Sequence, residues 1–143
     1  MVFNPYANTL NLPFVIAEIG INHNGDMHTC KMMIDAAKDA GCDAVKFQKR
    51  DVPTVYTREY LDSKRQSPFG TTQREQKLGL EFTEAQYDEV RDYCLIKDIM
   101  WFASAWDVKS QEFLQKYDCP VNKVASAMLT HGSLLQEVDK EGK

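Results

Sequence analysis

The sequence predicts an α/β fold in which parallel strands alternate with helices. Short apolar runs of strand length alternate with segments in which apolar residues recur every three or four positions. Three of these helical segments begin with a typical capping residue, Asp26, Thr83 or Asp107. Strands that alternate with helices imply parallel pairing through right-handed crossovers.

The expected strands are FVIAEIG, CDAVKFQKR, IMWFASAW and VNKVASAML, at residues 14–20, 42–50, 99–106 and 121–129. The first helix follows Asp26 and ends at Gly41, a residue type common at helix C-termini. The second opens on a capping box of Thr83 and Gln86. The third is expected to run from Asp107 to Tyr117, and a fourth begins near SLL, residues 133–135.

A long segment without a clear pattern, roughly residues 51–81, separates the second strand from the second helix. It holds scattered charge, prolines and glycines, and two pieces that read as helix, EYLDSKRQ and TQREQKLG. A connection of this length inside a compact domain is usually functional. We expect it to form a lid over a site.

Composition and charge exclude several classes of protein. A chain of 143 residues with a formal net charge of −4 and no basic stripe indicates one soluble domain without a nucleic-acid partner. No apolar run is long enough to span a membrane, and the start, MVFNPYANTL, lacks the pattern of a signal peptide. Four cysteines without CxxC spacing indicate reduced thiols of a cytoplasmic protein.

Polar side chains recur at the carboxyl ends of the predicted strands, where parallel α/β folds bind ligands. They are Glu18, Asn22, Lys46, Gln48, Ser104, Lys123 and Ser126. Alternation places Lys46 and Gln48 on the same face of their strand. Because a buried lysine needs a compensating anion, two lysines near serine hydroxyls predict a phosphate or carboxylate site. Glu18 would handle a proton or a sugar hydroxyl.

The residues alone leave alternatives open. Lys46 could simply pair with Glu18 in a structural role, or Lys123 could lower the pKa of Lys46 for a Schiff-base aldolase. His23 and His28 are spaced poorly for a shared metal ion. The strand order fits either an open doubly wound sheet or part of a (β/α)₈ barrel, of which this length supplies about half.

The motifs AEIGINHNG, DAVKFQKR, WFASAWD and NKVASAMLT, in this order, resemble the N-terminal half of the sialic acid synthase family, which includes N-acetylneuraminate, legionaminate and pseudaminate synthases. SPFG, at residues 67–70, is similar to a bacterial subgroup. The resemblance implies that residues 1–143 are four β/α units, the first half of a (β/α)₈ TIM barrel. The C-terminal half and a small antifreeze-like domain would be absent.

The resemblance also implies an activity. The expected enzyme is a cytoplasmic, homodimeric transferase that condenses phosphoenolpyruvate with an N-acetylated hexosamine of the N-acetylmannosamine type. The products would be a sialic-acid-like nonulosonate and phosphate. Carried over by motif, Lys46 and Lys123 would bind the phosphate and carboxylate of phosphoenolpyruvate with help from Ser126, and Glu18 and Gln48 would contact the amino sugar.

The resemblance implies a divalent metal, Mn²⁺ or Mg²⁺, with its ligands in the missing half and none in this chain. Two motifs depart from the family pattern: SAWD stands where STPF is usual, so Ala105 replaces a phosphate-binding threonine, and Met128 replaces a sugar-binding glutamate. A truncated, non-catalytic binding remnant is therefore the alternative to an active synthase.

Overall fold

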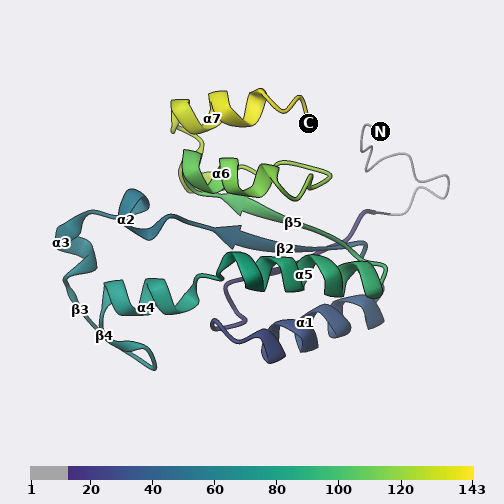
Figure 1. Ribbon diagram of the computed structural model, residues 1–143, viewed down its shortest axis with the longest axis horizontal. Coiled ribbons are helices and arrows are strands. Elements are labelled where there is room, and N and C mark those ends of the chain that lie inside the picture. The colour runs from purple at the N-terminus through teal and green to yellow at the C-terminus, as the bar shows by residue number, and fades with distance from the viewer. Residues whose placement is uncertain (1–12) are drawn as a thin grey trace.

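A parallel three-stranded sheet forms the centre of the computed structural model, which describes residues 13–143. Its strands are β1 (Ile16–Gly20), β2 (Ala44–Lys49) and β5 (Met100–Ala105), in the spatial order β1-β2-β5. The helices around it are α1 (Met27–Asp39), α5 (Glu84–Ile96), α6 (Val108–Gln115) and α7 (Gly132–Asp139). Figure 1 shows α1 and α5 side by side and α6 and α7 stacked beyond β5. The predicted α/β class is confirmed.

One face of the sheet forms the core with α1 and α5. Phe47 of β2 and Trp101 of β5 lie on this face, with ring centroids 6.4 Å apart. Tyr87 of α5 packs on Trp101 at 6.1 Å and donates its hydroxyl to the carbonyl of Gln48. Because neighbouring strand residues point to opposite faces, Lys46 and Gln48 lie on the other side of the sheet.

Side-chain caps fix where the helices begin. The Asp26 carboxylate accepts from the Thr29 N–H, and Thr83 and Gln86 form the predicted capping box. Asp107 is buried and accepts from the Ser110 N–H and hydroxyl. These predictions are confirmed, although α6 ends at Gln115, two residues before the expected end. The turns that follow the strands are therefore held in place by local bonds.

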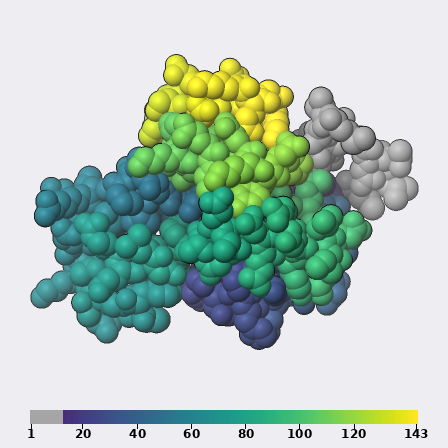
Figure 2. Space-filling view, viewed as in Figure 1, coloured from purple at the N-terminus to yellow at the C-terminus, as the bar shows by residue number. Residues whose placement is uncertain are grey.

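The segment 51–81 is a compact lobe, which projects from the body in Figures 1 and 2. It contains α2 (Val52–Val55), α3 (Arg58–Leu61), the antiparallel hairpin of β3 (Lys64–Ser67) and β4 (Gly70–Thr72), and α4 (Gln73–Leu80). The helix expected at TQREQKLG is confirmed, whereas EYLDSKRQ is helical only at its start and then enters β3. The turn between the hairpin strands is SPFG, whose proline and glycine are typical turn residues.

The lobe begins and ends at one point of the sheet. Arg50 follows β2, and its Nε donates to Glu81 Oε1 at 2.6 Å. The Arg50 backbone N–H donates to the other oxygen of the same carboxylate. One residue earlier, the Lys49 ammonium donates to the carbonyl of Phe82 at 3.2 Å. These bonds clamp the two ends of the lobe together.

The fourth strand predicted at 121–129 is wrong, so the described residues hold three parallel strands rather than four β/α units. Residues 121–125 have no regular structure, and Ser126–Met128 form a 3₁₀ turn. The segment is rich in alanine and also holds asparagine and lysine, all types that are depleted in strands. Within residues 13–143 no strand follows this segment, so a strand at 121–129 would have had no partner on its outer edge.

Three further predictions concern compartment and solubility. No helix within residues 13–143 is long and apolar enough to cross a membrane. All four cysteines are free thiols, and burial raises the pKa of Cys30, Cys94 and Cys119 to about 12, so these three stay protonated. The MVFNPYANTL stretch, on which the signal-peptide prediction depends, lies outside the described residues.

Candidate functional site

Lys46 and Glu18 form an ion pair on the sheet face turned away from α1 and α5. Lys46 Nζ lies 2.8 Å from Glu18 Oε1, with the lysine side chain 7% exposed and the glutamate 66% exposed. The register brings the two residues to the same level of the sheet, because Ala17 lies opposite Val45 and, after an irregularity in β1, Gly20 lies opposite Phe47. A buried ammonium whose partner faces solvent can also bind an incoming anion.

Gln48 and Ser104 lie one step further along the same face. They are direct neighbours in the register of β2 and β5. The Ser104 hydroxyl is buried and has no hydrogen-bond partner. Gly20 of β1 adjoins the Gln48 amide, since a Cβ built on this glycine would be in ordinary contact with Gln48 Nε2, at 3.5 Å. A buried hydroxyl without a partner is rare in folded proteins and suits a bound ligand or water.

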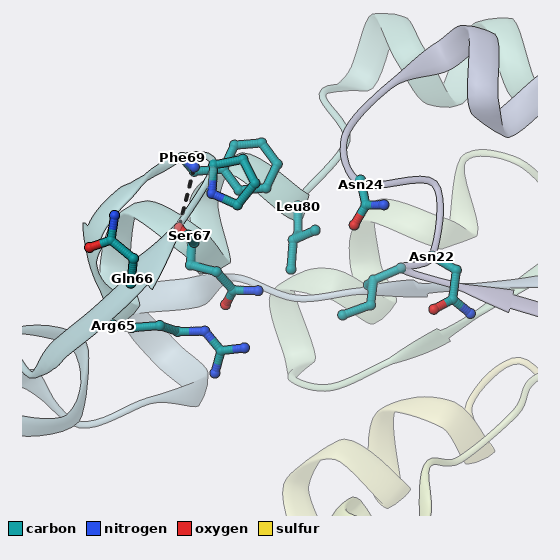
Figure 3. Close-up of a pocket in the computed structure, with 10 residues that line it drawn as sticks. Asn22, Asn24, Arg65, Gln66, Ser67, Phe69 and Leu80 are labelled. Carbon is teal, nitrogen blue, oxygen red and sulfur yellow. Dashed lines mark hydrogen bonds between the residues drawn. The ribbon is translucent and has the colours of Figure 1, made fainter.

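A pocket of about 530 Å³ separates the turn after β1 from the lobe. Figure 3 shows Asn22 and Asn24 on one side and the β3–β4 turn on the other. The lining residues are Ile21, Asn22, Asn24, Arg65, Gln66, Ser67, Pro68, Phe69, Gln76 and Leu80. Amides, a guanidinium and an aromatic ring together suit a ligand with several hydroxyl or amide groups.

Beside this pocket, at Gly25, the lobe is in direct contact with the β1 turn. A Cβ built on Gly25 would lie 2.1 Å from the Gly79 carbonyl oxygen, and one on Gly79 would lie 2.2 Å from the Phe69 ring. Gly25 also has a positive φ of 72°, which a glycine adopts without strain. Close backbone contact therefore holds the lobe against the β1 turn, and the role of the lobe as a lid stays a prediction.

His23 is a buried residue whose contacts stabilise the turn after β1. Its ring is 2% exposed and stacks on Phe82 with centroids 3.8 Å apart, and Nδ1 accepts from the Gly25 N–H at 3.1 Å. Burial lowers the pKa of His23 to about 4, with Arg50 adding to this effect and a hydrogen bond to the Gly20 backbone opposing it. The imidazole is therefore neutral at pH 7 and acts as a fixed acceptor.

This pKa predicts an acid-dependent loss of stability. The folded-state pKa lies below the ordinary value of 6.5, so the unfolded chain binds the proton first. The stabilisation is complete above pH 6.5 and falls as the pH drops toward 4, by up to about 3 kcal/mol. Urea unfolding of the wild type and of His23→Gln across this range should give curves that diverge. Parallel curves would show that the imidazole does not titrate differently in the two states.

The structure brings together four of the seven predicted site residues, Glu18, Lys46, Gln48 and Ser104, and places Asn22 on the pocket wall. Lys123 and Ser126 are exposed, and the Lys123 ammonium donates to the Val124 carbonyl. Their role in ligand binding stays a prediction.

Sequence reasoning missed Arg50 and the hairpin residues that line the pocket. Side chains alternate between the two faces of a strand, so the shared face of Lys46 and Gln48 would have indicated Arg50 as the next residue on it.

A family model described as "NeuB family" matches residues 33–143. This chain belongs to the NeuB family. The NeuB chain is 41% identical over 126 residues to the N-acetylneuraminate-9-phosphate synthase of Drosophila melanogaster, covering 87% of this chain and 34% of that protein. It is 35% identical over 128 residues to the N,N'-diacetyllegionaminic acid synthase of Legionella pneumophila, covering 86% of this chain and 35% of that protein. The chain therefore spans about a third of the length of these relatives.

Solved structures agree with this assignment. The crystal structure of an N-acetylneuraminic acid synthetase from Leptospira borgpetersenii in complex with citrate matches the NeuB chain with a TM-score of 0.75 and 27% identity, over 90% of this chain and 41% of that one. The spore coat polysaccharide biosynthesis protein SpsE of Bacillus subtilis matches with a TM-score of 0.66 and 28% identity, over 96% of this chain and 37% of that one. The resemblance and the prediction of a partial barrel are confirmed.

Proposed function

We propose that this NeuB chain binds phosphoenolpyruvate and an N-acetylated hexosamine for a condensation that yields a sialic-acid-like nonulosonate and phosphate. The observation that carries the proposal is Lys46, a buried ammonium on a parallel sheet whose ionic partner, Glu18, is open to solvent. Relatives are named synthases of such acids, and the Leptospira structure contains citrate, a polycarboxylate. Both support an anionic substrate at this site.

The reaction has three steps, in which this sheet face would take part. The enol carbon of phosphoenolpyruvate bonds to the aldehyde carbon of the open-chain sugar, water adds to the resulting cationic carbon, and the bond to phosphate breaks. Lys46 would neutralise the donor throughout these steps. Ser104 and Gln48 would donate neutral hydrogen bonds, and Glu18 would accept a proton from the water or a sugar hydroxyl.

The amino sugar fits the pocket between the β1 turn and the lobe. Asn22 and Asn24 on one wall and Gln66 and Gln76 on the other offer amide donors and acceptors for hydroxyl and acetamido groups. Phe69 supplies an apolar surface for the acetyl methyl group or a sugar face.

The resemblance implies Mn²⁺ or Mg²⁺, which the described residues do not fit. Within residues 13–143 no group of three or more His, Cys, Asp and Glu side chains could hold a metal ion. Each step above therefore uses this chain's own side chains. Metal ligands outside this chain, a homodimer and a cytoplasmic location stay predictions.

Phosphate release tests the proposed function. The chain is mixed with phosphoenolpyruvate, N-acetylmannosamine and Mn²⁺, and phosphate and product mass are measured. We expect release only when both substrates are present, and less with N-acetylglucosamine, which differs at one carbon. The proposal is overturned if phosphoenolpyruvate neither binds nor yields phosphate.

A non-catalytic binding chain is the second candidate, and its support is that Ala105 and Met128 stand where the resemblance implies a phosphate-binding threonine and a sugar-binding glutamate. It predicts that phosphoenolpyruvate binds in calorimetry but is not consumed. The aldolase alternative gains nothing from the geometry, because Lys46 is ion-paired with Glu18 and only an uncharged amine attacks a carbonyl. Borohydride should therefore trap no carbonyl substrate on this lysine.

A further inference from the structure

The sheet face that carries Lys46, Gln48 and Ser104 continues one residue pair further along the strands. The next residues of the same parity are Arg50, after β2, and Trp106, after β5. The ladder reaches this far, because the Trp106 N–H donates to the Lys49 carbonyl at 3.0 Å. The Arg50 guanidinium carbon lies 5.7 Å from the centre of the Trp106 ring. The two side chains therefore lie next to each other, one residue pair beyond Gln48 and Ser104.

Both side chains hold a buried donor without a partner, Nη2 of Arg50 and Nε1 of Trp106. Arg50 is 4% exposed, and its remaining side-chain nitrogens are bonded, Nε to Glu81 and Nη1 to the Tyr56 hydroxyl at 3.2 Å. Together with Ser104 Oγ, these atoms make three buried polar atoms that have no hydrogen-bond partner, and they lie at neighbouring positions of one edge of the sheet. Buried donors are normally satisfied, so their concentration here points to a ligand that accepts hydrogen bonds.

The charges around Arg50 favour an anionic ligand. Glu81 is the carboxylate bonded to Arg50, and it also lies 4.0 Å from the Lys49 ammonium. A third cation, Lys77, lies over the Tyr56 ring, and burial together with the nearby arginines lowers its pKa. Of the other acids near this point, Asp51 pairs with Lys109, whereas Asp107 accepts hydrogen bonds from the neutral Ser110 hydroxyl and from backbone N–H groups, which leaves Arg50, Lys49 and Lys77 against Glu81 and Asp107. Positive charge is therefore in excess.

We propose that Arg50 and Trp106 form a second anion subsite, in which Nη2–H and Nε1–H donate to oxygens of one phosphate or carboxylate group. The inference rests on the proposed function, since it places a further contact to the same substrates. The group belongs either to phosphoenolpyruvate or to a phosphate carried by the amino sugar. Arg50 and Trp106 are then substrate-contacting residues that set specificity.

The indole N–H signal of Trp106 tests the proposal directly. The chain has two tryptophans, so a ¹H–¹⁵N spectrum holds two indole signals, and Trp106→Phe identifies the relevant one. The wild type is titrated with inorganic phosphate, phosphoenolpyruvate and N-acetylmannosamine 6-phosphate. N-acetylmannosamine and sodium chloride at matched ionic strength are the controls. We expect the Trp106 signal to shift with at least one phosphate compound and with neither control.

Substitution of the arginine completes the test. Arg50→Lys keeps the charge but removes Nη2, and it should weaken the titrated affinity at least tenfold. Arg91→Lys, at an exposed arginine of α5 that pairs with Asp88 and Asp92, is the matched control and should leave the affinity unchanged. If Arg50→Lys does not fold, Trp106→Phe decides, because it removes only one donor and should weaken phosphate binding measured by calorimetry.

The outcomes separate the possibilities. A shift with phosphate and phosphoenolpyruvate assigns the subsite to the donor, and a shift with the sugar phosphate alone assigns it to the acceptor. If none of the three phosphate compounds shifts the Trp106 signal, the subsite is overturned and the buried donors bind water only. The same conclusion follows if Arg50→Lys leaves the affinity unchanged. Phosphoenolpyruvate binding that depends on Lys46, with none of the three phosphate compounds bound more weakly by Arg50→Lys, sinks the inference alone. A phosphate shift at Trp106 without phosphoenolpyruvate binding sinks the proposed function alone.

Discussion

Replacing Gly25 with alanine is expected to destabilise the protein by about 3 kcal/mol or more. The new Cβ would lie 2.1 Å from the Gly79 carbonyl oxygen, a backbone atom that moves only if α4 moves. The positive φ of 72° adds about 1–2 kcal/mol of backbone strain. The lobe would shift away from the β1 turn, so the pocket between them should lose its shape as well.

Gly41 provides the matched control for this prediction. It has a φ of +79°, but nothing lies within 4 Å of a Cβ built on it. Gly41→Ala should therefore cost about 1–2 kcal/mol, the backbone strain alone. Urea unfolding of the two variants and the wild type measures the difference. If the two substitutions cost the same, the close contact between the turn and α4 is not a source of stability.

Replacing Lys46 with methionine is expected to weaken phosphoenolpyruvate binding by about 10- to 100-fold. Hydrogen bonds to charged groups contribute about 1.5–3 kcal/mol, and each 1.4 kcal/mol is a factor of ten in affinity. Stability should change little, because Glu18 is mostly exposed and its carboxylate remains solvated when the lysine is lost. Calorimetry with phosphoenolpyruvate and urea unfolding together separate the effect on binding from the effect on folding.

Lys116→Met is the control for charge, since this exposed lysine pairs with Glu84 at 2.8 Å on the protein surface. It removes the same charge and should leave phosphoenolpyruvate binding within about twofold. Unchanged binding in Lys46→Met would mean that the lysine serves only its ion pair with Glu18. The structural interpretation of this pair would then replace the functional one.

Features that depend on near neighbours in the sequence were predictable here. The caps at Asp26, Thr83 and Asp107 follow from residue type and spacing, because a capping side chain bonds to the backbone two or three residues on. The common face of Lys46 and Gln48 follows from strand alternation. An ion pair of Lys46 with Glu18 is one of the alternatives that follow from the position of both residues near strand ends.

Features that depend on distant partners were not predictable. The pocket joins Asn22 to the β3–β4 hairpin, more than forty positions along the chain, and no spacing rule relates the two. The strand expected at 121–129 had a plausible pattern, but a strand forms only when its edges find partners. The sequence pattern of a segment shows which secondary structures it is able to form, and pairing with strands that are distant in the sequence determines which one it adopts.

The clamp of Arg50 on Glu81 has a consequence for how this protein family can diversify. Because the two ends of the lobe are fixed to each other and to the sheet, the residues between them can change in number without moving a strand. Each doubling of a flexible loop's length costs only about 0.6 kcal/mol in closure entropy. The lobe can thus change in length while the sheet that holds Lys46 keeps its position.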